Sequence, residues 1–177
     1  MGCKPVRSSA CLGLWDKCPS DSRYVYLTDA YAFYFAQNAC HDAGEDALLV
    51  EVEVNRGKLD ADEDYLGQAS VGTEWETDFP NLIERTLAMR QATASLPNNS
   101  RLTLMENALA NLGTTRHSGP IKPSQIRRMA RIPNGDITRI VLQECDPTIT
   151  IMNYRIMGER YRAFQQSLFD RYPLEVN

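Results

Sequence analysis

The stretch Arg23-Tyr24-Val25-Tyr26-Leu27-Thr28-Asp29-Ala30-Tyr31-Ala32-Phe33-Tyr34-Phe35-Ala36 decides the fold, because a strand pattern changes into a helix pattern within it. Residues 24–28 are mostly β-branched and aromatic, which favours a half-buried strand. The run from Ala30 to Cys40 is rich in alanine and aromatic residues and predicts a helix, for which Asp29 is a suitable N-cap. A strand that leads directly into a helix indicates a chain of mixed α and β structure.

The residues that follow predict a second strand and an acidic loop. From Ala47 to Val54, the apolar residues Leu48, Val50, Val52 and Val54 alternate with a mostly charged set, which is typical of a strand with one apolar face. Residues 59–65 (Leu-Asp-Ala-Asp-Glu-Asp-Tyr) carry four acids and predict a solvated loop.

Two helices are predicted in the middle of the chain. Asp78-Phe79-Pro80 starts the first, because proline in a first turn removes only an amide that has no partner, and residues 98–100 end it. Thr103 and Glu106 have the spacing of a capping box, so the second helix is expected over 104–112, with Gly113 closing it.

The last third predicts two strands, 136–144 and 148–152, and a final helix from about Tyr154 to Tyr172. The aromatic and apolar stripe of this helix keeps helical spacing throughout, which indicates core packing. It comprises Tyr154, Met157, Tyr161, Phe164, Leu168 and Tyr172.

Length and composition fit one globular domain. The chain has 177 residues, 43% of them hydrophobic and 24% charged, which excludes a disordered tail or a rod. We expect a single α+β domain with a small twisted mixed sheet, flanking helices and a long amphipathic C-terminal helix. Residues 1–22 form an irregular lead-in to a core over 23–177. No apolar run approaches the roughly 20 residues of a membrane span, so a cytoplasmic protein is expected.

The net charge of −4 conceals two segments of opposite sign. Residues 42–78 hold twelve acids against two bases, whereas residues 116–139 hold six bases against one acid. Either the basic segment binds an anionic ligand while the acidic segment keeps the chain acidic, or the two segments neutralise each other.

Metal binding has little support in the sequence. The five cysteines, Cys3, Cys11, Cys18, Cys40 and Cys145, include no Cys-x-x-Cys pair, and only His41 and His117 could accompany them. The acids at 60, 62, 63 and 64 lack the glycine and the spacing of an EF-hand. We therefore predict no metal site.

The common catalytic signatures are absent, including phosphate loops, dinucleotide fingerprints and nucleophile elbows. The segment 23–36 instead resembles a motif of the ADP-ribosyltransferase superfamily, in which a Tyr-Leu-Thr/Ser strand end and an Ala-containing helix lie beside the nicotinamide pocket. Three later segments resemble successive motifs of that family, which includes the RNA 2′-phosphotransferases. They are residues 47–54, 58–66 and 119–126. The acidic segment 58–66 is similar to a loop of small phage and bacterial members.

The resemblance implies an NAD-binding site and transfer of ADP-ribose to a protein or a nucleic acid. Cleavage of NAD requires an aromatic face, ribose-binding hydroxyls, bases for the pyrophosphate and usually a carboxylate. The implied catalytic residues are Tyr26, Thr28 and His117, and the implied cofactor-binding residues are Arg7, Tyr31, Tyr34 and Arg116. For Tyr31 and Tyr34 the alternative is packing of an amphipathic helix.

Two departures from the family pattern bear on activity. No counterpart of the family's first motif precedes residue 23, and Thr114-Thr115-Arg116-His117 stands where a transferase has its catalytic glutamate. The sequence is therefore compatible with an active transferase or with one that has lost part of its site.

A second hypothesis is a non-enzymatic phage anti-defence or inhibitor protein that acts in the host cytoplasm. It would bind a basic host protein through the acidic residues 42–78. A nucleic-acid partner ranks last, because the basic residues 121–139 lack the interleaved aromatic residues of a stacking platform.

Overall fold

The computed structural model of this chain describes residues 24–30, 32–144 and 154–175. The strands are β1 (Tyr24–Thr28), β2 (Ala47–Val52), β3 (Leu59–Asp60), β4 (Thr114–Ser118), β5 (Ile126–Ile132) and β6 (Pro173–Leu174). The helices are α1 (Ala32–Ala43), α2 (Glu63–Ala69), α3 (Glu74–Asp78), α4 (Leu82–Ala94), α5 (Asn98–Leu112), α6 (Asn134–Glu144) and α7 (Tyr154–Arg171), with short 3-10 turns at Arg56–Lys58 and Pro123–Gln125.

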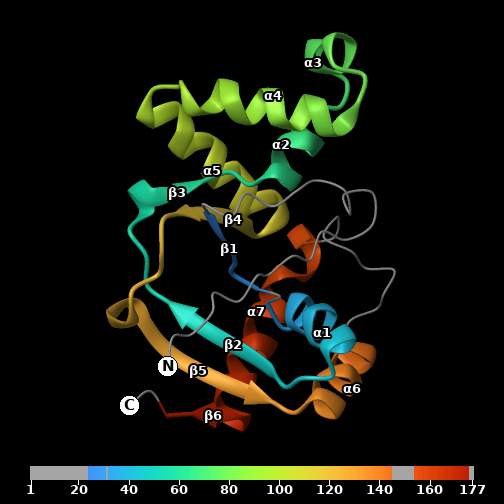
Figure 1. The fold of residues 1–177 in the computed structure, drawn as a ribbon, viewed down its shortest axis with the longest axis vertical. Helices are drawn as coiled ribbons and strands as arrows, with labels where there is room; N and C mark the ends of the chain where they lie inside the picture. Colours follow the sequence, from blue (N-terminus) through green and yellow to red (C-terminus); the bar gives the residue numbers. More distant parts are fainter. Residues whose placement is uncertain (1–23, 31, 145–153, 176–177) are drawn as a thin grey trace.

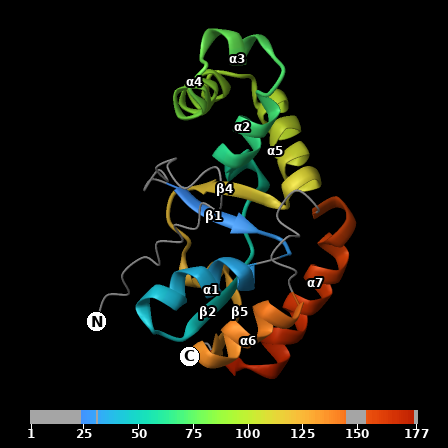
Figure 2. The ribbon, with the colours of Figure 1, turned by 90° about the vertical axis from the view of Figure 1, so that its right-hand side faces the viewer.

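The strands form two antiparallel sheets of three strands each, ordered β1-β4-β3 and β2-β5-β6. Figure 1 shows α2, α3, α4 and α5 at the end of the molecule beyond the first sheet, and α1 and α6 beside the second. In Figure 2, α7 runs along one side of the molecule. The expected α+β class with a C-terminal helix is confirmed, but the strands divide into two sheets because β4 and β5 pair with different partners.

The main core lies between the second sheet and helices α1, α6 and α7. Phe33 of α1 is fully buried, and its ring packs edge-on against Tyr161 and Phe164 of α7, with centroid separations of 6.1 and 5.2 Å. Leu49 of β2 is also buried in this core. The C-terminal stripe therefore packs as the sequence predicts, among the described residues 157–172.

The strand pattern of β2 selects the opposite face from the expected one. Ala47 and Leu49 are buried, whereas the side chains of Leu48 and Val50 are 40% and 39% exposed. Strand residues alternate between two faces, so burying Leu49 in the core turns its neighbours outward. Two members of the predicted apolar set, Leu48 and Val50, are therefore exposed, whereas Val52 and Val54 are half-buried.

One predicted element is of the wrong type and another begins earlier than predicted, and both lie next to proline. The predicted strand 136–144 is helix α6, because Ile137, Ile140 and Val141 are buried at helical spacing and the Ile137 amide bonds to the Pro133 carbonyl at 2.9 Å. The helix predicted over 104–112 begins at Asn98, directly after Pro97.

The supposed capping box is inside helix α5. Thr103 donates to the Asn99 carbonyl at 3.1 Å, one turn back along the helix. Gly113 does end α5 as predicted, with φ of 64° and its amide 3.0 Å from the Leu109 carbonyl. The N-cap assigned to Asp29 fails as well, because α1 begins at Ala32 and the Asp29 carboxylate binds Arg162 at 3.0 Å.

The predicted lead-in 1–22 and the predicted strand 148–152 lie outside the described residues. Within the described ranges, no helix is long and apolar enough to cross a bilayer.

Candidate functional site

The first sheet brings three of the predicted site residues onto one face. Tyr26 of β1 lies opposite Arg116 of β4, and Thr28 lies opposite Thr114. Residues paired across an antiparallel ladder project to the same side, and residues two apart in a strand share a face. Tyr26, Thr28 and Arg116 therefore lie on one surface of the sheet, although β1 and β4 are far apart in sequence.

Arg116 is a buried cation at the centre of this face. Its side chain is 3% exposed, and Nη1 donates to Glu63 Oε1 of α2 at 2.7 Å. Arg90 Nη1 of α4 approaches the same oxygen at 3.1 Å. One carboxylate thus holds two guanidinium groups and fixes the direction of Arg116.

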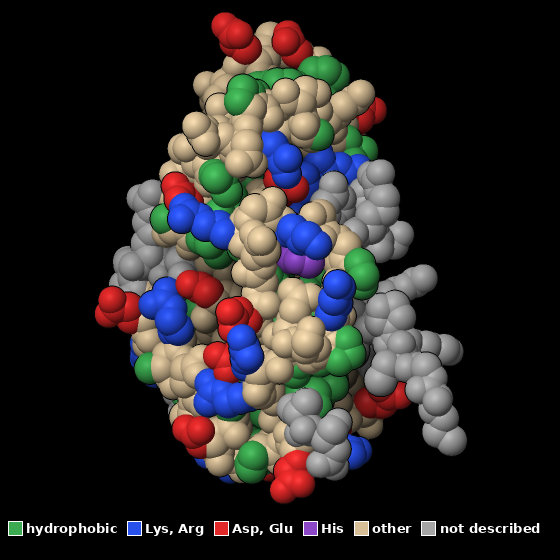
Figure 3. Space-filling model, turned by 90° about the vertical axis from the view of Figure 1, so that its left-hand side faces the viewer, with side chains coloured by type: hydrophobic (Ala, Val, Ile, Leu, Met, Phe, Trp, Pro, Cys, Tyr) green, Lys and Arg blue, Asp and Glu red, His purple; other side chains and the backbone are tan. Residues whose placement is uncertain are grey.

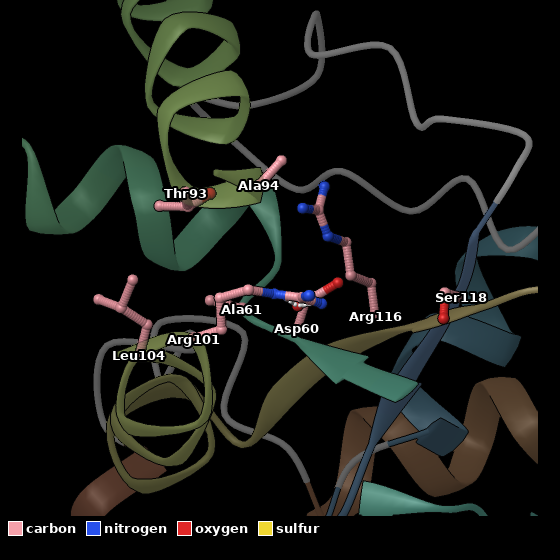
Figure 4. Close-up of a pocket in the computed structure, with 8 residues that line it drawn as sticks. All are labelled: Asp60, Ala61, Thr93, Ala94, Arg101, Leu104, Arg116 and Ser118. Atoms are coloured by element: carbon pink, nitrogen blue, oxygen red, sulfur yellow. Dashed lines mark hydrogen bonds and ion pairs between the residues drawn. The ribbon is translucent and has the colours of Figure 1, made fainter. Parts of the chain in front are cut away.

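A pocket of about 200 Å³ opens beside Arg116. Figure 4 shows Thr93 and Ala94 of α4 on one side, Arg101 and Leu104 of α5 on another, and Arg116 and Ser118 rising from β4. Its lining is completed by Asp60 and Ala61.

Asp60 and Arg101 form an ion pair within this lining. Both Nε and Nη2 of Arg101 contact Oδ1 of Asp60, at 2.9 and 2.5 Å, and the two side chains are 14% and 31% exposed for Asp60 and Arg101. The backbone of Asp60 is fixed too, because Asp60 lies opposite Arg116 in the β3–β4 ladder and its carbonyl accepts the Thr115 hydroxyl at 2.6 Å.

The predicted acidic loop is largely buried, so its assignment as a solvated loop is wrong. Asp62 is the N-cap of α2, where its Oδ1 accepts the Tyr65 amide at 3.0 Å. Burial raises the pKa of Asp62. The pKa of Asp64 is raised to about 7, chiefly by burial and further by the charges of Asp62 and Glu63. Among the described residues, no group of three or more histidine, cysteine, aspartate or glutamate side chains is arranged to hold a metal.

His117 lies on the other face of the same sheet. It follows Arg116 in β4 and lies opposite Val25 and Leu59, so its side chain projects away from the pocket. The ring is 1% exposed, Nδ1 donates to the Gly119 carbonyl at 3.2 Å, and Nε2 is buried without a hydrogen-bond partner in the described part of the chain. His117 and Arg116 therefore do not converge on one ligand.

Of the predicted site residues that the structure describes, only Arg116 lines the pocket, whereas Tyr26 and Thr28 share its face of the sheet without being lining residues. Tyr34 of α1 packs against the main core, with its ring edge-on to Phe35 at 6.1 Å, which matches the packing alternative. Arg7 and Tyr31 lie outside the described residues.

The acidic and basic segments meet in the second sheet. Glu51 of β2 lies opposite Arg128 of β5, and Arg128 Nε is 2.5 Å from Glu51 Oε2. Asp46 pairs with Arg131 at 2.9 Å, and Glu53 pairs with Arg127. Figure 3 shows acidic and basic side chains interleaved over the lower part of one face of the molecule. The structure thus favours mutual neutralisation over two separate charged surfaces.

Sequence reasoning missed Glu63, Arg101 and Ser118 as site residues. Glu63 was visible only as part of an acidic run, and nothing in the local sequence distinguishes Arg101 from other helical arginines. Helix α5 packs against β3 and β4 and brings Arg101 to the pocket, whereas α2 packs against α4 and α5 and brings Glu63 to Arg116, 53 residues further along the chain.

Comparison with protein-family models, with curated proteins and with solved structures finds no match to this chain.

Proposed function

We propose that this chain binds an NAD-type nucleotide at the β1-β4-β3 face and acts as an ADP-ribosyltransferase-like protein on a protein or nucleic-acid target. The observation that carries the proposal is the placement of Arg116. It lies between Tyr26 and Asp60 in the sheet register, and it lines a pocket together with Arg101 and Ser118.

The residue types on this face suit a nucleotide. Guanidinium groups bind phosphate oxygens through planar, bidentate hydrogen bonds, so Arg116 and Arg101 are the pyrophosphate contacts. Tyr26 offers an aromatic ring for nicotinamide, and the Thr28 hydroxyl offers a hydrogen bond to ribose. The sequence resemblance assigned Tyr26, Thr28 and Arg116 to the same site, and the register is consistent with that assignment.

The position of the Glu63 carboxylate supports nucleotide binding more strongly than it supports transfer of ADP-ribose. Transfer of ADP-ribose builds positive charge on the ribose, which a carboxylate steadies. Glu63 is the carboxylate bonded to Arg116, but its Oε1 already accepts from Arg116 and Arg90. Glu63 is therefore a positioning residue for Arg116, and the proposal ranks nucleotide binding first and transfer second.

Isothermal titration with NAD tests the binding. Arg116→Gln and Tyr26→Ala should each weaken NAD binding by about tenfold or more, because each removes a direct ligand contact. Arg56→Gln is the matched control, since Arg56 pairs with Glu106 at an exposed position and does not line the pocket. Release of nicotinamide from NAD then measures transfer. Absence of heat with both NAD and 2′-phosphorylated RNA would contradict the proposal.

The alternative of an acidic docking surface over residues 42–78 receives less support. Among the described residues, six carboxylates of this segment are engaged by arginines of the same chain, which leaves fewer charges to attract a basic partner. They belong to Asp46, Glu51, Glu53, Asp60, Glu63 and Glu76.

A further inference from the structure

The carboxylate of Asp60 occupies the position on Arg101 that an anionic ligand would take. A single oxygen, Oδ1, accepts from both Nε and Nη2 of Arg101, and both residues line the pocket. A guanidinium edge binds a carboxylate and a phosphate with the same geometry. Asp60 therefore acts on Arg101 as an internal substitute for a bound anion.

The rest of Arg101 is available to a ligand. Its side chain is 31% exposed, and Nη1 has no hydrogen-bond partner among the described residues. The Asp60–Arg101 pair is partly solvated, so a ligand of higher charge can displace the carboxylate.

The charges around the pocket favour an anion. The lining of the pocket carries two guanidinium groups, those of Arg101 and Arg116, and one carboxylate, that of Asp60, which gives the lining residues a balance of +1. Moving the Asp60 carboxylate away from Arg101 increases the positive potential at the pocket. The pocket volume of about 200 Å³ is below the roughly 300–1,000 Å³ of sites for drug-sized molecules, so it suits one charged group better than a whole dinucleotide.

We infer that this pocket is a phosphate-binding subsite, in which a phosphate or pyrophosphate group displaces Asp60 from Arg101 and binds between Arg101 and Arg116. The inference deepens the proposed function, because the pyrophosphate of an NAD-type nucleotide would be the group bound. The exchange needs only a side-chain rotation, since the backbone of Asp60 is held by the β3–β4 ladder and by the Thr115 hydroxyl.

Titration of the full chain with inorganic pyrophosphate, and separately with inorganic phosphate, tests this subsite. Asp60→Asn keeps the size of the side chain and removes its charge, so it should tighten pyrophosphate binding by roughly three- to tenfold. Arg101→Gln should weaken it by about tenfold or more. A purely structural role for Asp60 would not produce tighter binding, so a tightening shows that the Asp60 carboxylate opposes the anion at this subsite.

Two variants control for charge alone. Asp46→Asn removes one acid from the second sheet, where Asp46 pairs with Arg131, and should leave pyrophosphate affinity within about twofold of the parent chain. Arg56→Gln removes one base outside the pocket and should behave likewise. Equal or weaker binding by Asp60→Asn overturns the inference, and so does an equal tightening by Asp46→Asn.

The titrations also separate this inference from the proposed function. If pyrophosphate binds and Asp60→Asn tightens it while NAD gives no heat, the anion subsite stands and the NAD assignment fails. If NAD binds and Asp60→Asn does not tighten either ligand, the proposed function stands and the displacement of Asp60 is wrong. A preference for pyrophosphate over phosphate identifies the nucleotide diphosphate, and not the free phosphate ion, as the ligand that the subsite fits.

Discussion

Glu63 of α2 and Arg116 of β4 form a buried ion pair, with 2.7 Å between Oε1 and Nη1 and side-chain exposures of 7% and 3%. Arg90 of α4 joins the same carboxylate oxygen, so the pair connects two helices to the first sheet. This link holds the pocket wall in place and is the first target for mutation.

Glu63→Gln should lower the free energy of unfolding by about 3 kcal/mol, because it removes the charge of the buried carboxylate that both Arg116 and Arg90 contact. Urea unfolding at pH 7 measures the loss. Glu53→Gln is the matched control: Glu53 pairs with Arg127 where both side chains are more than half exposed, so the expected loss is below about 1 kcal/mol. Equal losses in the two variants would contradict a special role for the buried pair.

Asp64 should make the protein less stable as pH rises from about 4 to 7. Its folded-state pKa is raised from 3.8 to about 7, so the folded chain holds a proton that the unfolded chain releases in this window. The free energy of unfolding then falls with rising pH. Asp64→Asn should flatten the profile between about pH 4 and pH 7, measured by urea unfolding. Asp78→Asn, in the exposed helix α3, removes a carboxylate as a control and should leave the profile unchanged; a profile that Asp64→Asn leaves unchanged as well would count against this assignment.

The pair Glu51–Arg128 should contribute a coupling energy of about 0.5–1 kcal/mol, because its side chains are directly opposed but partly exposed. A double-mutant cycle of Glu51→Ala and Arg128→Ala measures this energy, and 1 M salt should reduce it by screening. Arg128→Ala alone should cost more than Glu51→Ala, since Arg128 also lies 4.8 Å over the Phe169 ring. The reverse order would show that the ring contact is unimportant.

Phe33→Ala should destabilise the chain by about 3–5 kcal/mol, because it leaves a cavity between α1 and α7 in the main core. Leu48→Ala, at a position 40% exposed on the outer face of β2, should cost less than about 1 kcal/mol. Thermal or urea unfolding distinguishes the two. A larger loss at Leu48 would mean that the outer face of β2 is covered in solution.

The local sequence pattern predicted correctly those elements whose apolar residues follow a single period, either that of a strand or that of a helix. The strand at Tyr24–Thr28 and the helix from Tyr154 lie where the sequence indicates them, because their apolar spacing matches the face that is buried. The segment 136–144 failed because its apolar residues fit two periods. Ile140 and Leu142 alternate as in a strand, whereas Ile137, Ile140 and Val141 follow a helix, and packing against α1 selects the helix.

The site also contains residues that a local motif could identify and residues that it could not. Tyr26, Thr28 and Arg116 could be named from a local motif, and the β1–β4 register sets them on one face. His117 could be named too, but the alternation of side chains along β4 places it on the opposite face of the sheet. A local motif contains no information about which face the ligand contacts. Arg101 could not be named at all, because it comes to the pocket only through the position of α5.

The sequence by itself determined the α+β class, the C-terminal amphipathic helix and the two segments of opposite charge, since all three follow from composition and from spacing over a few turns. Only the tertiary structure decided which face of β2 is buried, that Glu51 opposes Arg128, and that Asp60 and Glu63 restrain Arg101 and Arg116 at one pocket. These relationships join residues some 40 to 80 positions apart. Sheet pairing and helix packing decide which of these residues meet. Because they join segments that are distant in the sequence, a local pattern does not predict them.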